Sequence, residues 1–405
     1  MKNFQQSLID RFVRYAKIDT PVNVHMAGKQ RPTNPAQLTL SRLLVTELEG
    51  MNIPVFSNEE GFVIGKIPAR GKGASLDPIA FMAHIDVADA APNTNIQPQV
   101  IPSYDGKPIT LADDITIDHP ELQQYIGTPI ITSDGTTLLG ADDKAGIAII
   151  MTLVEYLVHH PEQDHGAFEV VFTPDEEGGD GMSGFPIDHL EAKYAYTLDG
   201  GSIGGVTYEC YNAYTASVTL TGVSYHPGDA RGRMVNPISM AAAFINLLPR
   251  NESPEATDGY FGCYWPDDIQ SHGENVTLKV HIRDHDNTIA LRRIDALHAY
   301  AKAVEASFPN GKVSVEIHEA YRNMREEIDK MPVVMQRVYD AMQIVGITPI
   351  IYPTRGGTDG ARLTQMGRPC PNLFTGAHNI HARSEWLAID AAYKALHILI
   401  EMVKS

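Results

Sequence analysis

The hydrophobic and polar positions in the first half of the chain alternate between a helical and a strand spacing. Residues 36–48 and 142–159 carry apolar side chains at helical intervals. Short apolar runs at 79–83, 168–172 and 194–198 are typical of buried strands. Because helices separate these strands, the pattern predicts an α/β domain, a mixed sheet with helices on both faces.

The pattern changes near Tyr211. Apolar and polar residues then alternate, and they do so again at 276–282 and 313–317, as expected for strands with one side toward water. Helical spacing at 237–248 and 290–308 lies between them. This order predicts a small inserted α+β domain of the ferredoxin-like type.

The domain boundaries follow from this change of pattern. We expect residues 1–210 and 323–405 to form the larger domain and residues 211–322 to form an inserted lid. In the last part we expect a strand at 372–375 and a C-terminal helix that starts near Trp386.

The charge balance narrows the choice of partners. The chain has 405 residues and a formal net charge of -18, so we expect neither nucleic acid nor a membrane surface as a partner. The first 17 residues mix charged and apolar positions at helical spacing, unlike a signal peptide. No apolar run approaches the length of a membrane span.

The cysteine count indicates a reducing compartment. Cys210, Cys263 and Cys370 are far apart and odd in number, and they form no CxxC pair. We therefore expect neither a disulfide framework nor a thiolate zinc site, and we expect the protein to be cytoplasmic.

Acidic residues and histidines gather where the predicted strands end. Each group alone has an ordinary explanation, such as a helix cap or a solvated turn. Their recurrence at successive strand ends instead predicts a site for divalent cations, because sites in open α/β sheets form at the carboxyl ends of strands. The residues are His84, Asp86, Asp142, Asp143, Asp175, Glu176, Glu177, Asp199 and His381.

The order and wording of these groups resemble the dizinc exopeptidases, the clan that includes carboxypeptidase G and succinyl-diaminopimelate desuccinylase. The motifs are HID at 84–86, GADDKAG at 140–146, DEE at 175–177, Asp199 and HARSE at 381–385. The finer resemblance is to the peptidase T family of this clan. It rests on blocks that run in order along nearly the whole chain, among them FTPDEE at 172–177, RGGTDG at 355–360 and PCPNLFTG at 369–376.

The resemblance implies two zinc ions per chain. His84 and Asp199 would hold one ion, Glu177 and His381 would hold the other, and Asp142 would bridge them. His378 in the same loop as His381 competes for the last position, and the spacing to Glu385 favours His381.

The resemblance also implies the catalytic groups. Glu176 would act as the general base, and Asp86 would accept the free N–H of His84 and fix its tautomer. A histidine at the position of His226 would help to stabilise the oxyanion, although a histidine in such a turn is often incidental.

Three residues of the insertion are expected to bind substrate. Arg283 would clamp the C-terminal carboxylate, or else form an edge-strand salt bridge with Asp284 or Asp286. Asn212 and Asn323 would reach the peptide backbone, or else shape the crossings between the domains.

The implied activity is release of the N-terminal residue from short peptides, most of all tripeptides, by an aminopeptidase. Three alternatives stay open: a dipeptidase of the clan, an N-acyl amino-acid deacylase, and a non-catalytic peptide-binding homologue. The sequence leaves both a monomer and a homodimer open.

Overall fold

The computed structural model describes residues 3–179 and 181–404. It divides into two compact units. The first unit comprises the chain up to Tyr208, Glu326–Tyr352, and the chain from Thr358 onward. The second comprises Glu209–Arg325 and Pro353–Gly357. The sequence pattern did not predict that the short segment Pro353–Gly357 belongs with the second unit.

The first unit is built on an eight-stranded mixed sheet, as predicted. Its central pairs, β8 with β3, β3 with β9 and β9 with β16, are parallel, whereas β1–β2, β2–β8 and β16–β10 are antiparallel. In spatial order the strands are β1 (Val55–Ser57), β2 (Val63–Ile67), β8 (Phe168–Thr173), β3 (Ile79–His84), β9 (Tyr194–Gly200), β16 (Asn372–Phe374), β10 (Gly205–Thr207) and β15 (Ile350–Ile351).

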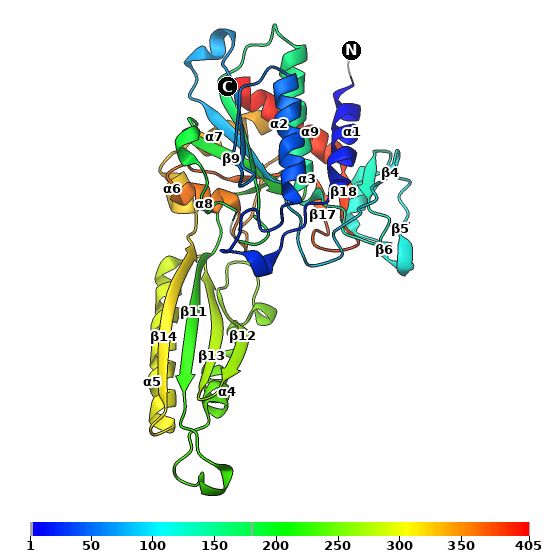
Figure 1. Cartoon of the computed structure of the whole chain (residues 1–405). Helices are drawn as coiled ribbons and strands as arrows, with labels where there is room; N and C mark the ends of the chain where they lie inside the picture. Colours follow the sequence, from blue (N-terminus) through cyan, green and yellow to red (C-terminus); the bar gives the residue numbers. More distant parts are fainter. Residues whose placement is uncertain (1–2, 180, 405) are drawn as a thin grey trace. The chain divides into compact units, whose positions relative to one another are not determined.

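Helices pack against this sheet. Helix α3 lies against β3 and β9 and also contacts α1 and α9 (Figure 1). On another side of the strands, Leu363 of α8 shares a core cluster with Ala80 and Met82 of β3. The helices of this unit are α1 (Phe4–Ala16), α2 (Gln37–Gly50), α3 (Ala141–His159), α7 (Val333–Val345), α8 (Asp359–Gln365) and α9 (Ile389–Lys404), with the short α6 (Arg325–Asp329) at its border with the second unit.

A second, smaller sheet in the first unit was not predicted. Its spatial order is β17 (Ala377–His378), β18 (Trp386–Ala388), β7 (Ile130–Thr132) and β4 (Gln99–Ile101), and β5 (Ile109–Thr110) pairs with β6 (Thr116–Ile117) separately. The expected start of the C-terminal helix near Trp386 is therefore wrong by three residues. Residues 386–388 form a buried strand, and the helix begins at Ile389.

The second unit has the order β-α-β-β-α-β of the ferredoxin-like type that the sequence predicts, although its second strand, Cys263–His272, was not among the expected elements. Its antiparallel sheet has the spatial order β12-β13-β11-β14 (Figure 1). The elements in chain order are β11 (Asn212–Thr221), α4 (Pro237–Leu247), β12 (Cys263–His272), β13 (Asn275–Asp284), α5 (Asn287–Ser307) and β14 (Lys312–Tyr321).

The core of the second unit lies between one face of its sheet and the two helices. Val218 of β11 and Leu278 of β13 pack in one cluster with Phe244 of α4 and Leu297 of α5. The alternate residues of β11 and β13 are mostly polar, so the other face of the sheet is not covered by these helices.

Two further observations concern the whole described chain. Among the described residues, no helix combines the length and the apolar character that a membrane crossing requires. Cys210, Cys263 and Cys370 are buried and form no disulfide.

The core of the second unit yields a stability prediction. Leu278→Ala should lower the free energy of unfolding by about 2–5 kcal/mol, because it leaves a cavity among packed side chains. The matched control is Leu291→Ala on α5, whose side chain is 47% exposed and whose loss should change that free energy by less than about 0.5 kcal/mol. Urea denaturation measures both variants, and equal effects would contradict this core assignment.

Candidate active site

The chemically important side chains meet at one edge of the large sheet. His84 is the last residue of β3, Glu176 and Glu177 follow the end of β8, and Asp199 lies near the end of β9. These three strands are parallel neighbours, so their carboxyl ends lie together. Asp142, in the first turn of α3, joins them.

Asp142 lies between the two histidines. Its Oδ1 is 2.8 Å from Nε2 of His84, and its Oδ2 is 3.2 Å from Nε2 of His381. The same nitrogen of His84 lies 3.8 Å from Asp199, and that of His381 lies 3.0 Å from Glu177. The structure thus brings together all five residues that the sequence singled out as metal ligands, and each Asp142 oxygen faces one histidine.

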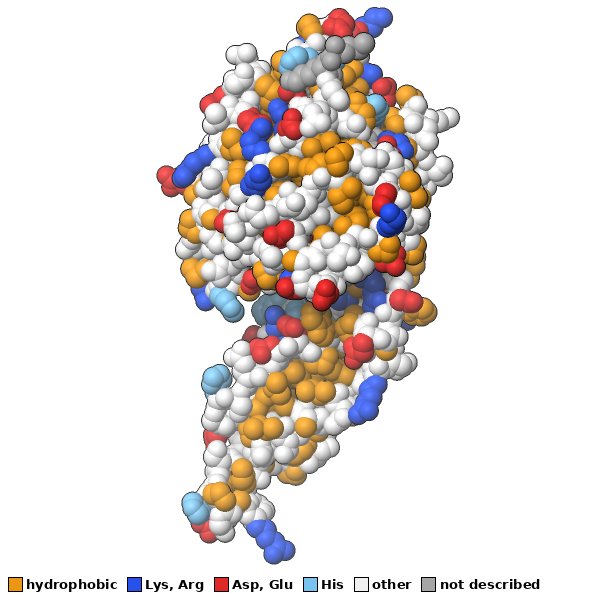
Figure 2. All heavy atoms as spheres, turned by 90° about the vertical axis from the view of Figure 1, so that its right-hand side faces the viewer, with side chains coloured by type: hydrophobic (Ala, Val, Ile, Leu, Met, Phe, Trp, Pro, Cys, Tyr) orange, Lys and Arg blue, Asp and Glu red, His pale blue; other side chains and the backbone are white. Residues whose placement is uncertain are grey.

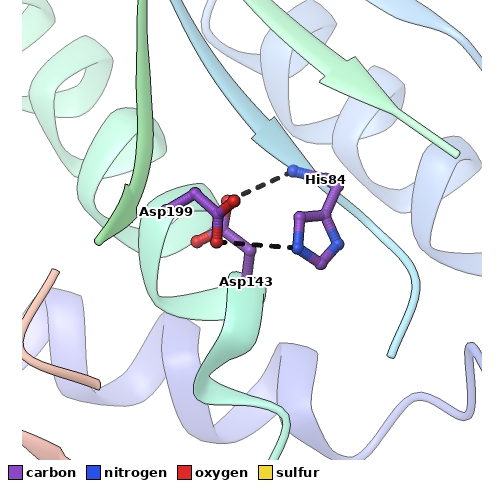
Figure 3. Close-up of side chains that lie close together, drawn as sticks. All are labelled: His84, Asp143 and Asp199. Carbon is purple, nitrogen blue, oxygen red and sulfur yellow. Dashed lines mark hydrogen bonds and ion pairs between the residues drawn. The ribbon is translucent and has the colours of Figure 1, made fainter. Parts of the chain in front are cut away.

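Asp143 is a member of the cluster that the sequence reasoning left without a role. Figure 3 shows it beside His84 and Asp199, and these three residues form one group whose donor atoms lie within 4.8 Å of one another. Its carboxylate also accepts hydrogen bonds from the backbone N–H groups of His84 and Gly146, both at 3.2 Å. Asp143 therefore connects the end of β3 to the start of α3.

Asp86 connects His84 to the two glutamates. Nδ1 of His84 lies 3.1 Å from the Asp86 carbonyl oxygen and 3.3 Å from its carboxylate. The same carboxylate accepts hydrogen bonds from the backbone N–H groups of Glu176 and Glu177, at 3.1 and 3.0 Å. This buried side chain therefore holds the β8 loop as well as the imidazole.

Glu385 holds the segment that carries Asp142. Its buried carboxylate accepts hydrogen bonds from the backbone N–H groups of Leu139, Gly140 and Asp142, at 2.7, 2.8 and 3.1 Å. Because Glu385 lies four residues after His381, it ties the loops of two cluster residues to each other. The sequence showed only its spacing, since a carboxylate with three backbone donors leaves no signature of its own.

Glu176 is half-buried and borders the cluster. Burial is the largest influence on its pKa and raises it well above the usual value. The positive charge of His84 opposes this rise, whereas the negative charges of Asp199 and Asp359 add to it. Asp359, at the start of α8, accepts a hydrogen bond from the Thr173 hydroxyl at 2.5 Å and was not singled out from the sequence.

The pKa values of the cluster show a surplus of negative charge. Burial and the charge of Asp142 raise the pKa of Asp199 to about 7. Hydrogen bonds to Asp142 and Glu177 raise the pKa of His381 to about 10. Burial lowers the pKa of His84, but its hydrogen bonds to carboxylates outweigh this and raise it well above normal. Each of these three raised pKa values means that the group holds its proton to a higher pH. The site therefore favours positive charge.

The donor set fits divalent cations. Two imidazoles and several carboxylates converge without any thiolate, which suits zinc or a similar ion. Among the described residues no Lys or Arg forms an ion pair with Asp142, Glu177 or Asp199. Carboxylates that are withdrawn from water even in part are costly without such partners, unless a cation compensates them.

His378 makes its polar contact with Glu121 and not with Asp142. Its Nδ1 is 2.9 Å from Glu121, and its ring stacks on Trp386 with the centroids 4.0 Å apart. Of the two histidines that the sequence left in competition, His381 is the one that contacts Asp142 and Glu177.

Arg283 lies on the face of the lid sheet that its helices leave open. Its guanidinium donates to the carbonyl oxygens of Tyr214 and Ile282, at 2.8 and 3.0 Å, and among the described residues it forms no ion pair. The alternative of an edge-strand salt bridge is wrong, because β13 lies inside the sheet and Asp284 pairs with Arg293 at 3.0 Å.

The side chains of Asn212 and Asn323 form hydrogen bonds with backbone groups where the chain enters and leaves the insertion. The Asn212 amide donates to the carbonyl oxygens of Asp284 and His285 and accepts from the backbone N–H of Asn323. The Asn323 side chain donates to His285 and accepts from the backbone N–H of Cys210. These contacts favour the second role considered for them, which is to shape the crossings into and out of the insertion.

His226 and Arg283 lie at opposite ends of the lid sheet. Arg283 pairs with Ala213 near the start of β11, whereas the loop of His226 follows Thr221 at its end. At about 3.3 Å per residue, Ala213 and Thr221 are roughly 26 Å apart. An extended tripeptide spans at most about 11 Å. One lid therefore cannot place both residues on the same tripeptide.

Comparisons with known proteins agree with this arrangement. The model of the Peptidase family M20/M25/M40 matches residues 134–405. The chain is 42% identical over 410 residues to Peptidase T of Bacillus licheniformis, with 100% of this chain and 98% of that protein covered. It is also 42% identical to Peptidase T of Geobacillus thermodenitrificans, with 99% and 98% covered.

Solved structures share the fold. Aminopeptidase PepT of Bacillus cereus superposes with a TM-score of 0.76 at 21% identity, covering 99% of this chain and 98% of that chain. A tripeptidase of Staphylococcus aureus has the same TM-score at 19% identity, with 99% and 98% covered.

The fold and the site define a peptidase. More narrowly, the chain belongs to the Peptidase family M20/M25/M40 and, within it, to the peptidase T group.

The surplus negative charge predicts stabilisation by metal. Zinc added to chelator-treated protein should stabilise the folded state by about 2.7 kcal/mol at a free concentration 100 times the Kd, because the ion binds only the folded site. Thermal denaturation measures this as a rise in Tm, and Asp142→Asn should shrink the rise. A Tm that zinc leaves unchanged would contradict the metal site.

Proposed function

We propose that this chain is a zinc-dependent aminopeptidase that releases the N-terminal residue of tripeptides. The observation that carries the proposal is the convergence of two histidines and the carboxylates around Asp142 beside Glu176. The substrate class is supported by full-length relatives named Peptidase T and by the shared fold of a tripeptidase. The three buried, unpaired cysteines suit a cytoplasmic location.

Five residues are proposed to hold the metal. His84 and Asp199 would bind one zinc ion, Glu177 and His381 would bind a second, and Asp142 would bridge them. When bound, the ions would polarise the peptide carbonyl and lower the pKa of a water molecule to about 7. Asp86 and Glu385 would then act as positioning residues, through the loop contacts described above.

Glu176 is proposed as the general base. Its side chain forms no hydrogen bond with any described residue, so it is available to a water molecule. It would take the proton of the attacking water and pass it to the leaving amine.

Arg283 is proposed to bind the C-terminal carboxylate of the peptide. The guanidinium has no carboxylate partner among the described residues, so its charge is not compensated within the lid. A binding group for the far end of the peptide would limit substrate length, because both ends of the peptide must then be held.

His226 is proposed to act on the peptide bound by a second copy of the chain, as an oxyanion donor. This follows from its distance to Arg283 along the lid sheet, and it favours a homodimer over a monomer. Figure 2 shows hydrophobic side chains gathered on one face of the second unit. Trp265 and Ile269 on the edge strand β12 are 46% and 51% exposed, and such an edge is a ready surface for pairing.

The assignment of Glu176 as the general base predicts a large loss of turnover when its carboxylate is removed. Glu176→Ala should reduce the rate of methionine release from Met-Gly-Gly by about 10²–10⁴-fold, because it removes the proposed acceptor of the water proton. Bound zinc, measured by mass spectrometry of the metal, should stay at the wild-type level.

The same assay separates the alternatives. Wild type should leave N-acetyl-Met-Gly-Gly intact and cut Met-Gly and Met-Gly-Gly-Gly slowly. Cleavage of the acetylated peptide would instead indicate a deacylase, and preference for Met-Gly a dipeptidase. Normal activity of the Glu176 variant would contradict the base assignment.

The two-copy arrangement predicts complementation. His226→Ala and Glu176→Ala should each be nearly inactive alone. After unfolding and refolding together they should regain partial activity, because a mixed dimer contains one site with both an intact Glu176 and an intact His226. Peptide hydrolysis measures the gain, and a mixture as inactive as its components would contradict the shared site.

A further inference from the structure

A cavity of about 240 Å³ lies beside the metal-binding cluster, within the first unit. Asp142, Asp143 and Asp199 of the cluster line it. Thr375 and the residues 200–201, which follow Asp199, and 377–380, which precede His381, line it as well. Among the described residues that line it, neither Glu176 nor Glu177 appears.

The role proposed for Glu176 indicates which part of the substrate this cavity faces. Glu176 gives its proton to the leaving amine, so the C-terminal part of the peptide lies on the side of Glu176. The acyl part, which is the first residue of the peptide, lies on the other side of the scissile bond. The cavity is lined by Asp142, Asp143 and Asp199 of the cluster but, among the described residues, by neither glutamate, and therefore matches the acyl side.

The composition of the wall indicates which side chains fit. Ala377 and Ile380 contribute apolar groups, and Gly200 and Gly201 contribute none that would fill the space. A Cβ added to Gly201 would lie 3.3 Å from the carbonyl oxygen of Ala377, so the gap between these two residues is narrow there. Such a space suits an apolar side chain of medium size.

The carboxylate of Glu121 contacts His378, which lines the cavity, and Ser202, which follows the lining residue Gly201. Glu121, in the 3-10 helix Pro120–Tyr125, accepts hydrogen bonds from the Ser202 hydroxyl at 2.9 Å and lies 2.9 Å from Nδ1 of His378. No Lys or Arg pairs with it among the described residues. Burial lowers the pKa of His378 to about 4, so the imidazole is neutral and leaves the charge of Glu121 uncompensated.

We propose that this cavity receives the first residue of the peptide, with an apolar side chain inside it and the α-ammonium group on the side of Glu121. The inference rests on the proposed aminopeptidase function and adds the substrate preference of that site. Gly201 and Ile380 set the size of the side chain that is accepted, and Glu121 contributes attraction for the positive amino terminus.

The test compares kcat/KM for Ala-Gly-Gly, Leu-Gly-Gly and Phe-Gly-Gly. Gly201→Ala narrows the cavity and should lower the ratio of the Phe to the Ala substrate about tenfold. Ile380→Ala widens it and should raise that ratio. Because the side chain of Ile380 is 46% exposed, the Ile380→Ala variant should fold even if the Gly201→Ala variant does not. The control Ile344→Ala, at a side chain 65% exposed on α7, should leave the ratio unchanged.

A charge variant tests the orientation. Glu121→Gln keeps a hydrogen-bond acceptor for Ser202 but removes the charge, and it should raise KM about tenfold with little change in kcat. The matched control Asp105→Asn removes an exposed charge elsewhere and should change neither.

Two failures are distinguishable. If wild type cuts the tripeptides but the foldable cavity variants keep the wild-type ratios, or Glu121→Gln keeps the wild-type KM, this inference is overturned and the proposed function stands. If wild type with bound zinc cuts none of the tripeptides, the proposed function falls, and this inference falls with it.

Discussion

Mutual repulsion among half-buried carboxylates is the constraint on which the rest of the site depends. Asp142, Glu177 and Asp199 converge at one sheet edge, and within the described part of the chain only imidazoles are their positive partners. Removing such charges from water is costly, and their repulsion adds to that cost. The raised pKa values of Asp199 and His381 express the same surplus in terms of protons. Divalent cations offset it directly, so a site this unfavourable without them is organised around their binding.

Two further carboxylates keep these charges together, because they accept hydrogen bonds from the backbone N–H groups of the loops that carry the ligands. Asp86 fixes the loop after β8 while it contacts His84, and Glu385 fixes the segment before α3. Each joins elements that are distant in the sequence. The ligand side chains are therefore set by loops that have few conformations left, which is the preorganisation that metal sites and electrostatic catalysis need. Neither residue has to touch the substrate to matter for the reaction.

The sequence predicts the α/β unit well, because strands and helices of ordinary length alternate there and the residues with metal-binding chemistry follow the strands. It fails where local pattern is ambiguous or where function depends on register. The buried run at Trp386 resembles the start of a helix, yet it pairs as a strand. Asp143 looks like a helix cap until its contact with His84 is seen. The separation of His226 and Arg283 becomes visible only once β11 is paired with β13.

The most direct test is a crystal of the zinc-loaded protein measured on both sides of the zinc absorption edge. Two anomalous peaks are expected about 3.5–4 Å apart, with one Asp142 oxygen on each and His84 and His381 on different ions. A single peak, or peaks that do not contact Asp142, would contradict the account of a bridged two-metal peptidase.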